Sequence, residues 1–121
     1  MTNTNEEIKK FQKELNAGTT ALVLLGVLGQ TSEPMYGYQI AKFIEANDKD
    51  IPIMKLGALY PVLRSLESSG LLESEVEPSV SGPPRRYYRI TETGRETMKR
   101  WNEIWDHTKA LVDNIMHGEE Q

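Results

Sequence analysis

The feature that most constrains the fold is a seven-residue turn segment, 78–84, with the sequence Pro-Ser-Val-Ser-Gly-Pro-Pro. Proline and glycine favour backbone angles that break regular structure, so the chain must change direction here. The runs on either side, 71–76 and 85–90, are short and have the composition of strands. Two such strands joined by a turn predict a β-hairpin.

The periodic segments before the hairpin are helical. Ile8, Phe11 and Leu15 are spaced three and four apart, as on one face of a helix. The sequence around Gly18 weakens this pattern, so we expect a separate second piece at Ala21–Leu28. That piece is apolar on all sides, which suits a buried helix, although a buried strand has the same pattern. A turn is expected at 29–34, followed by a helical stripe formed by Tyr36, Ile40, Phe43 and Ile44.

The next helix has the clearest apolar face, which consists of Leu59, Val62, Leu63 and Leu66. Proline has no backbone N–H and fits best in a first turn, so Pro61 places the start of this helix near Gly57. Gly70 is well placed to end it in a left-handed conformation.

A long final helix is expected after the hairpin. Thr91 or Thr93 can cap its start, and Thr93 with Glu96 matches a capping box. A narrow stripe then recurs at alternating steps of three and four, and a helix that packs on a second helix needs such a seam. We therefore predict that Met98, Trp101, Trp105, Val112 and Ile115 form a packing seam against another helix.

The order of elements defines the fold class: mainly α with a small β-hairpin. Two short helices followed by a hairpin form a winged helix-turn-helix, here with a long C-terminal helix. We place a DNA-binding domain with an N-terminal helix at residues 1–92, and the C-terminal helix with its tail at 93–121.

The charge distribution permits DNA binding but does not point to it alone. The net charge is −4. Residues 55–95 contain six basic and five acidic side chains and so carry +1, which leaves −5 for the rest. Arg85, Arg86 and Arg89 lie close together with no acid between them, and a local basic face can bind phosphate on an acidic protein.

The helix at 57–69 is the candidate reading element. A helix fits the major groove of DNA and usually reads bases near its N-terminus. The residues left outside the apolar face include Gly57, Ala58, Tyr60, Pro61 and Arg64. The two small residues allow a close approach, the tyrosine suits a phosphate or sugar, and the arginine suits phosphate or guanine. The alternative is an ordinary amphipathic helix with a solvated arginine.

Strand alternation divides the basic strand between two faces. Arg86 and Tyr88 share one face, and Arg85, Tyr87 and Arg89 share the other. Tyr88, with Ile90, also suits a core-facing position. Arginines beside a Gly-Pro tip suit a phosphate or minor-groove probe. The alternative is an edge strand that its charges protect from aggregation.

Other chemistry finds no support in the sequence. There is no Gly-rich phosphate loop, nucleophile triad or pair of catalytic carboxylates, so we do not expect an enzyme or a cofactor. Glu103 and His107 are four apart, but two ligands make no metal site. The absence of cysteines suits a reducing cytoplasm. The first residues lack the apolar run of a signal peptide, and Ala21–Leu28 is too short to span a membrane. We expect a cytoplasmic protein without membrane contact.

Three segments resemble the PadR family of transcriptional regulators: Tyr36–Ile40, Leu59–Leu71 and Gly82–Gly94. They follow the family's order within residues 18–100, and the single helix after the hairpin fits the subfamily with a short C-terminal region. The resemblance implies a dimeric repressor on a near-palindromic, double-stranded operator, relieved by a small molecule or another signal. It also implies that the helix at 93–121 is a dimerisation helix, whose packing seam is the homodimer interface. The predicted DNA contacts are Tyr36, Gly57, Ala58, Tyr60, Pro61, Arg64, Arg85, Arg86 and Tyr88.

The resemblance also concerns Trp105. In some PadR relatives that bind planar drugs, a tryptophan at the matching position lines a pore between subunits. A planar aromatic effector could therefore stack on Trp105, with Trp101 as a second candidate, and plain packing in the dimer core is the alternative.

Unlike the family pattern, the first hairpin strand is unusually acidic, with Glu73, Glu75 and Glu77. The rival function is a winged-helix module that binds protein, which an exposed apolar patch on the hairpin would favour.

Overall fold

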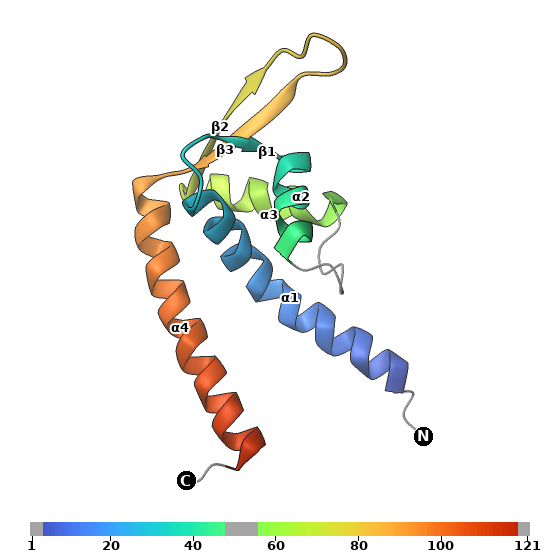
Figure 1. Cartoon of the computed structure of the whole chain (residues 1–121), viewed down its shortest axis with the longest axis vertical. Helices are drawn as coiled ribbons and strands as arrows, with labels where there is room; N and C mark the ends of the chain where they lie inside the picture. The colour runs from blue at the N-terminus through green and yellow to red at the C-terminus, as the bar shows by residue number, and fades with distance from the viewer. Residues whose placement is uncertain (1–3, 48–55, 119–121) are drawn as a thin grey trace.

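The computed structural model describes residues 4–47 and 56–118. Its elements follow in the order α1 (Thr4–Gly29), β1 (Met35–Tyr36), α2 (Gly37–Asn47), α3 (Leu56–Ser68), β2 (Leu72–Glu77), β3 (Arg85–Ile90) and α4 (Glu92–His117). The β2–β3 hairpin, called the wing below, projects from one end of the molecule (Figure 1). The start of α1 and the end of α4 lie at the opposite end. The predicted helix, helix, hairpin and long helix are confirmed.

The N-terminal segment forms one helix, so the prediction of two separate pieces was wrong. A glycine inside a helix costs about 1 kcal/mol relative to alanine, which is too little to break a helix that packing holds. The Thr19 hydroxyl also donates to the Leu15 carbonyl at 2.9 Å, one turn back across Gly18. The apolar run that follows is a buried helix and not a strand: Leu24 and Leu25 are fully buried.

The core lies where the second half of α1, which contains this apolar run, meets the other elements. It is a single cluster of Leu24, Leu25, Val27, Leu28, Ile40, Leu59, Leu63, Leu66, Leu71, Leu72, Tyr88 and Ile90. The first half of α1 lies outside this core, and its apolar residues Ile8, Phe11 and Leu15 are exposed. Helices α2 and α3 and the sheet therefore share one small core with the second half of α1.

The sheet has three antiparallel strands in the order β1-β3-β2, one more than the predicted hairpin. Strand β1 pairs Met35 with Tyr88 and Tyr36 with Tyr87. Two residues are too few to show strand periodicity, which is why Tyr36 was assigned to the following helix. The wing pairs β2 with β3 from Leu72 opposite Ile90 to Glu77 opposite Arg85.

The end of α3 confirms the prediction for Gly70. This residue has φ of 81°, in the left-handed region where glycine is favoured. Its N–H donates to the Glu67 carbonyl, and the Leu71 N–H donates to the Leu66 carbonyl, both at 2.9 Å. These two bonds form a Schellman motif, which turns the chain sharply from α3 into the wing.

The start of α4 is capped by Thr91, and the capping box predicted for Thr93 and Glu96 is absent. The Thr91 hydroxyl accepts a hydrogen bond from the Gly94 N–H at 2.9 Å. A side chain at position 94 would clash with the Leu71 carbonyl and approach Ile90 Cγ1 to 2.7 Å. The chain therefore needs glycine at the position where a capping box after Thr91 would place a glutamate.

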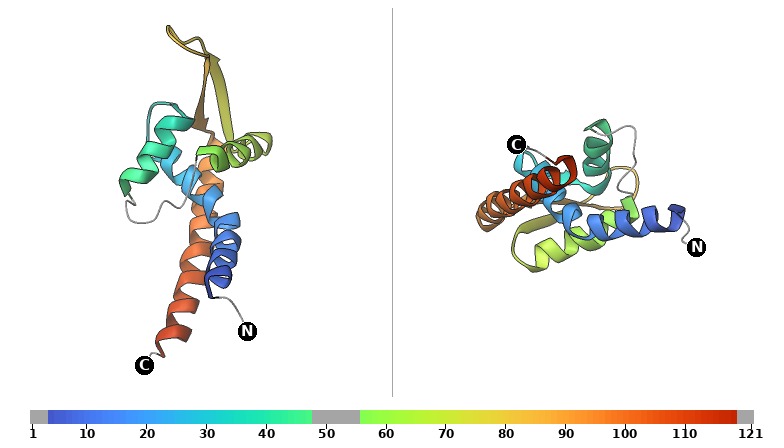
Figure 2. Two further views of the ribbon diagram at one scale, coloured as in Figure 1. Left: turned by 90° about the vertical axis from the view of Figure 1, so that its right-hand side faces the viewer. Right: turned by 90° about the horizontal axis from the view of Figure 1, so that it is seen from below.

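The first half of α4 contacts α1 near the wing end of the molecule, and the two helices diverge toward the ends marked N and C (Figures 1 and 2). Arg95 Nη1 donates to the Gly29 carbonyl at 3.2 Å, and the Met98 side chain rests against the same glycine. The second half leaves apolar side chains uncovered, with 49–73% of each exposed: Leu111, Val112, Ile115 and Met116. Among the described helices, none has both the length and the apolar character needed to span a membrane.

Candidate nucleic-acid interface

Helix α3 presents the outward face that the sequence predicted. Ala58, Pro61 and Arg64 are exposed, as is Gly57, whereas Leu59 on the opposite face is fully buried. Among the described residues, no atom outside the helix lies within 4 Å of a Cβ atom placed at Gly57. This exposed face has the form that a helix needs to enter a major groove.

Tyr60 has a second contact that the sequence did not reveal. Its ring lies on Gly37, the first residue of α2: a Cβ atom there would be 2.7 Å from the Tyr60 hydroxyl oxygen. Tyr60 remains 37% exposed. Tyr60 therefore joins α3 to the start of α2 while part of its side chain stays exposed. The close approach of its ring explains the glycine of the Tyr-Gly pair at 36–37.

Tyr88 is not available to DNA, so its assignment as a DNA contact was wrong and its core-facing alternative is correct. Only 2% of this residue is exposed, because its side of β3 covers the core. Burial is the main cause that raises its pKa; Glu67 also raises it, whereas Arg86 and Arg64 lower it. These charges come from α3 and the wing, so Tyr88 lies at the junction of the two elements.

The same junction holds Arg86. Its Nη1 donates to the Ser74 hydroxyl oxygen at 2.9 Å, and that hydroxyl donates to Glu67 Oε2 at 2.6 Å. The chain of contacts runs from β3 through β2 to α3. Sequence analysis missed Ser74 and Glu67, because their role depends on the strand register and on the packing of β2 beside α3.

The opposite face of the sheet gathers aromatic rings around Tyr36. The Arg85 guanidinium lies 4.5 Å from the centre of the Tyr36 ring. Tyr87 meets that ring edge-on at 5.3 Å between centroids, and Tyr38 stacks on it at 6.4 Å. Lys42 extends the cluster over Tyr38. The structure thus brings together two predicted DNA contacts, Tyr36 and Arg85. It adds Tyr38 and Lys42, which were not among the predicted contacts.

The acidic residues of β2 explain how the two wing faces differ. Glu73, Glu75 and Glu77 are paired in register with Arg89, Tyr87 and Arg85. Arg89 Nε donates to Glu73 Oε2 at 2.8 Å, and this hydrogen bond is the main cause that raises the pKa of Arg89. The glutamates therefore offset the arginines on that face. Arg86 lies on the other face, toward α3.

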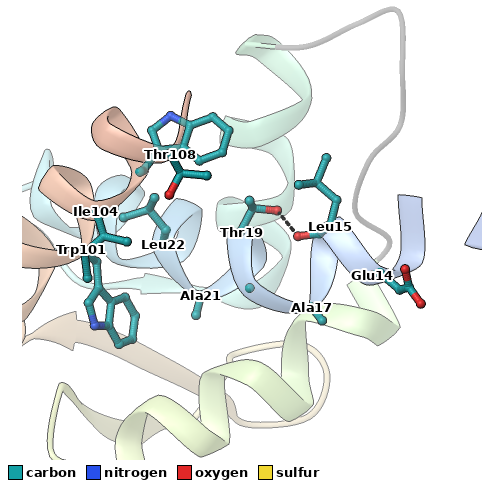
Figure 3. Close-up of a pocket in the computed structure, with 11 residues that line it drawn as sticks. Glu14, Leu15, Ala17, Thr19, Ala21, Leu22, Trp101, Ile104 and Thr108 are labelled. Atoms are coloured by element: carbon teal, nitrogen blue, oxygen red, sulfur yellow. Dashed lines mark hydrogen bonds between the residues drawn. The ribbon is translucent and has the colours of Figure 1, made fainter. Parts of the chain in front are cut away.

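The two tryptophans line one cavity between α1 and α4, with a volume of about 530 Å³ (Figure 3). The α1 side contributes Leu15 and Leu22, and Glu14 is the one charged residue of the lining. Both tryptophans are half-buried, and Trp101 also packs against the core. The arrangement suits an apolar or aromatic molecule.

The stripe predicted for dimerisation divides into two parts. Met98 and Trp101 pack against the core of their own chain. Val112 and Ile115 are 49% and 71% exposed and contribute little to this chain's packing. A role between subunits stays a prediction for the stripe, and the exposed half of α4 is the part left free for it.

Within residues 4–47 and 56–118, no three acidic or histidine side chains are grouped to hold a metal ion.

Comparison with known proteins gives consistent matches. The sequence model described as "Transcriptional regulator PadR-like family" matches residues 24–100. A PadR family transcriptional regulator from Eggerthella lenta is 33% identical, with 96% of this chain and 97% of that chain covered and a TM-score of 0.75. A transcriptional regulator from Clostridium thermocellum is 28% identical, with 84% and 96% covered and the same TM-score. An uncharacterized protein of Lysinibacillus sphaericus is 31% identical over 83 residues, 69% of this chain and 76% of that protein.

Proposed function

The chain belongs to the PadR-like family of transcriptional regulators, and on that premise we propose that it is a homodimeric repressor of a near-palindromic operator. PadR regulators bind DNA and are not enzymes. On this proposal residues 1–92 form the DNA-binding domain and residues 93–121 the dimerisation helix and tail. The protein acts in the cytoplasm, where the DNA of a bacterium lies.

The observation that carries the proposal is the meeting of α3 and the wing at Tyr88. The exposed face of α3 carries Arg64, and Arg86 reaches the same junction from β3. A helix for the major groove and an arginine for the neighbouring backbone thus lie side by side, as groove reading requires. We assign the predicted DNA contacts Gly57, Ala58, Tyr60, Pro61, Arg64 and Arg86 to this surface. Tyr36 and Arg85 would contact DNA from the opposite face of the sheet.

The alternative of a protein-binding module has less support. Such a module needs a continuous apolar patch of several hundred Å². The exposed large apolar residues of the described wing are Val76, between two glutamates, and Val80, between two serines. Two valines are too few for a patch of that size.

The homodimer is supported by the second half of α4. Its exposed apolar side chains would be unfavourable in water on a monomer, and an interface between two copies would bury them. A dimer with twofold symmetry also gives the operator its near-palindromic form.

Release from the operator is assigned to the cavity between α1 and α4. Trp101 and Trp105 line it, and a planar aromatic effector stacked on Trp105 would gain about 0.5–1.5 kcal/mol beyond the area that it buries. Such a compound releases the DNA only if it prefers a dimer geometry in which the two reading helices no longer fit.

The test is a gel shift with the DNA upstream of the protein's own gene and with random DNA of equal length, at one moderate salt concentration. We expect the operator to bind at least about a thousandfold more tightly. Transcription from that promoter in vitro should fall when the protein is added. Equal affinity for both DNAs would contradict operator binding, and unchanged or increased transcription would contradict repression.

A further inference from the structure

We propose that Glu67 and Ser74 are positioning residues, which fix the tilt of the wing relative to α3 through their hydrogen-bonded chain to Arg86. The reading face of α3 and the arginine of the wing would then reach DNA at one fixed spacing. This inference rests on the proposed operator binding, and it names residues that contact no DNA themselves.

The wing needs such a tether because most of its length lies beyond the core. The last buried residues of the strands are Leu72 and Tyr88, and β1 supports β3 only as far as Tyr87. Further out, β2 and β3 pair with each other alone, and Val76 is 52% exposed. A two-stranded ribbon is at best marginally stable in water. Its direction therefore depends on contacts at its base.

The chain of contacts at that base has the geometry of strong hydrogen bonds. The Ser74–Glu67 separation of 2.6 Å is typical of a hydroxyl that donates to a carboxylate. A serine hydroxyl has one proton, which is used for Glu67, and its lone pair accepts from Arg86 at 2.9 Å. Each bond polarises the other. Because the Ser74 hydroxyl takes part in both bonds, its loss breaks both.

The contacts on the opposite face do not reach α3. The Glu73–Arg89 ion pair joins β2 to β3, and the Arg85 guanidinium over the Tyr36 ring joins β3 to β1. The Ser74–Glu67 bond crosses from the ribbon to α3. The tilt of the wing relative to α3 is therefore controlled on the Arg86 face.

Glu67 also permits a sharp distinction between two roles. A carboxylate near a DNA-binding surface repels phosphate, so a merely electrostatic role predicts that its removal tightens binding to every DNA. A positioning role predicts the opposite for the operator. Ser74 carries no charge, so its removal isolates the positioning effect.

The binding experiment measures the ratio of operator affinity to random-DNA affinity for Ser74→Ala, Glu67→Ala and the double variant. Each should lower the ratio by about three- to tenfold, the effect expected for one hydrogen bond, and the double variant should be no worse than either single one. Ser74→Thr retains the hydroxyl and should restore the ratio. Glu73→Ala is the matched control, since it removes a charge from the same strand without changing the hydrogen bonds of Glu67, Ser74 and Arg86. Its affinity ratio should equal the parent's.

A second measurement does not depend on DNA. The sequence has no cysteine, so Ser68→Cys on α3 and Val80→Cys at the wing tip can carry a pair of spin labels. Labelled chains are diluted with unlabelled parent so that distances within one chain are measured. The distance distribution should be narrow in the parent and in Glu73→Ala, and broader in Ser74→Ala.

The two measurements separate the possible failures. A parent that does not prefer the operator would contradict the proposed function, while the spin-label distances would still test the tether. An unchanged distance distribution in Ser74→Ala would overturn the tether. So would a parent-like ratio for Ser74→Ala combined with tighter binding of Glu67→Ala to both DNAs.

Discussion

Arg64 and Arg85 are both exposed, but their surroundings predict different roles in DNA binding. Arg64 lies on the outward face of α3, where the base edges of a major groove would be, whereas Arg85 lies on the strand next to the wing turn. Arg64→Ala should therefore reduce discrimination between operator and random DNA by about 1–3 kcal/mol. Binding titrations on both DNAs measure this, and equal losses on the two would contradict a reading role.

Arg85→Ala should instead weaken binding to both DNAs by the same factor. A phosphate contact releases counterions, so its loss should reduce the slope of log affinity against log salt concentration by about one. Titrations at four or five salt concentrations give this slope. An unchanged slope would mean that Arg85 contacts no phosphate and serves mainly to cover the Tyr36 ring.

Two glycines test the packing at the residue scale. A methyl group at position 94 would meet the Leu71 carbonyl and Ile90, so Gly94→Ala should lower the free energy of unfolding by about 1–3 kcal/mol. Gly18→Ala is the matched control, because nothing lies within 4 Å of its added methyl group. It should raise the free energy of unfolding by about 0.5–1 kcal/mol.

Urea unfolding at one fixed protein concentration compares the three proteins, since the stability of a dimer depends on concentration. A Gly94→Ala variant as stable as the parent would show that the start of α4 adjusts more easily than the close contact with Leu71 indicates.

At the scale of elements, α3 and the wing strands were predictable because their signals are local. Apolar spacing and Gly70 define α3, and the turn at 78–84 separates two short strands. The single helix α1 was not predictable from the sequence around Gly18, because packing decides whether a helix continues through a glycine. Strand β1 was missed because its pairing with β3 is a contact between distant segments.

The candidate site shows the same difference between local signals, which the sequence reveals, and contacts between distant segments, which it does not. Alternation along β3 placed Arg86 and Tyr88 on one face, but only the packing of that face on the core shows which of them stays free. The contacts of Ser74 with Glu67 and of Arg85 with Tyr36 depend on the register of three strands. A single sequence does not specify that register.

The exposed half of α4 gives a prediction for the dimer. Val112→Asp with Ile115→Asp places two charges on the proposed interface while the core of each chain is left intact. We expect monomers at micromolar concentration, because a buried unpaired charge costs several kcal/mol. Sedimentation equilibrium measures the mass, and Ala110→Asp, at an exposed position on the opposite side of α4, serves as the control. A double variant that remains dimeric would place the interface elsewhere.

The cavity between α1 and α4 gives a prediction for the effector. A planar aromatic dye should quench the tryptophan fluorescence of the parent. Trp105→Ala should bind the dye up to about tenfold more weakly, because the stacking contact is lost. Trp101→Ala serves as the comparison, although its packing on the core also requires a stability measurement. Equal dye affinity in the parent and Trp105→Ala would mean that Trp105 only packs.

At the scale of the whole molecule, the first turns of α4 are fastened to the DNA-binding body. Thr91 caps the helix, Arg95 holds the end of α1, and Met98 fills the space beside Gly29. In the proposed dimer, a change at the α1–α4 cavity would therefore move the DNA-binding elements of one subunit relative to those of the other. Such a movement alters the spacing of the two reading helices, which is how an effector bound far from the DNA would act.

The central claim is that two copies of α3 read one operator as a symmetric pair. Hydroxyl-radical footprinting on the upstream DNA tests it most directly. We predict two protected regions of equal strength, related by a twofold axis, with centres about 34 Å or one helical turn apart. Arg64→Ala should weaken both regions together. A single protected region, or protection spread evenly along the DNA, would contradict the account.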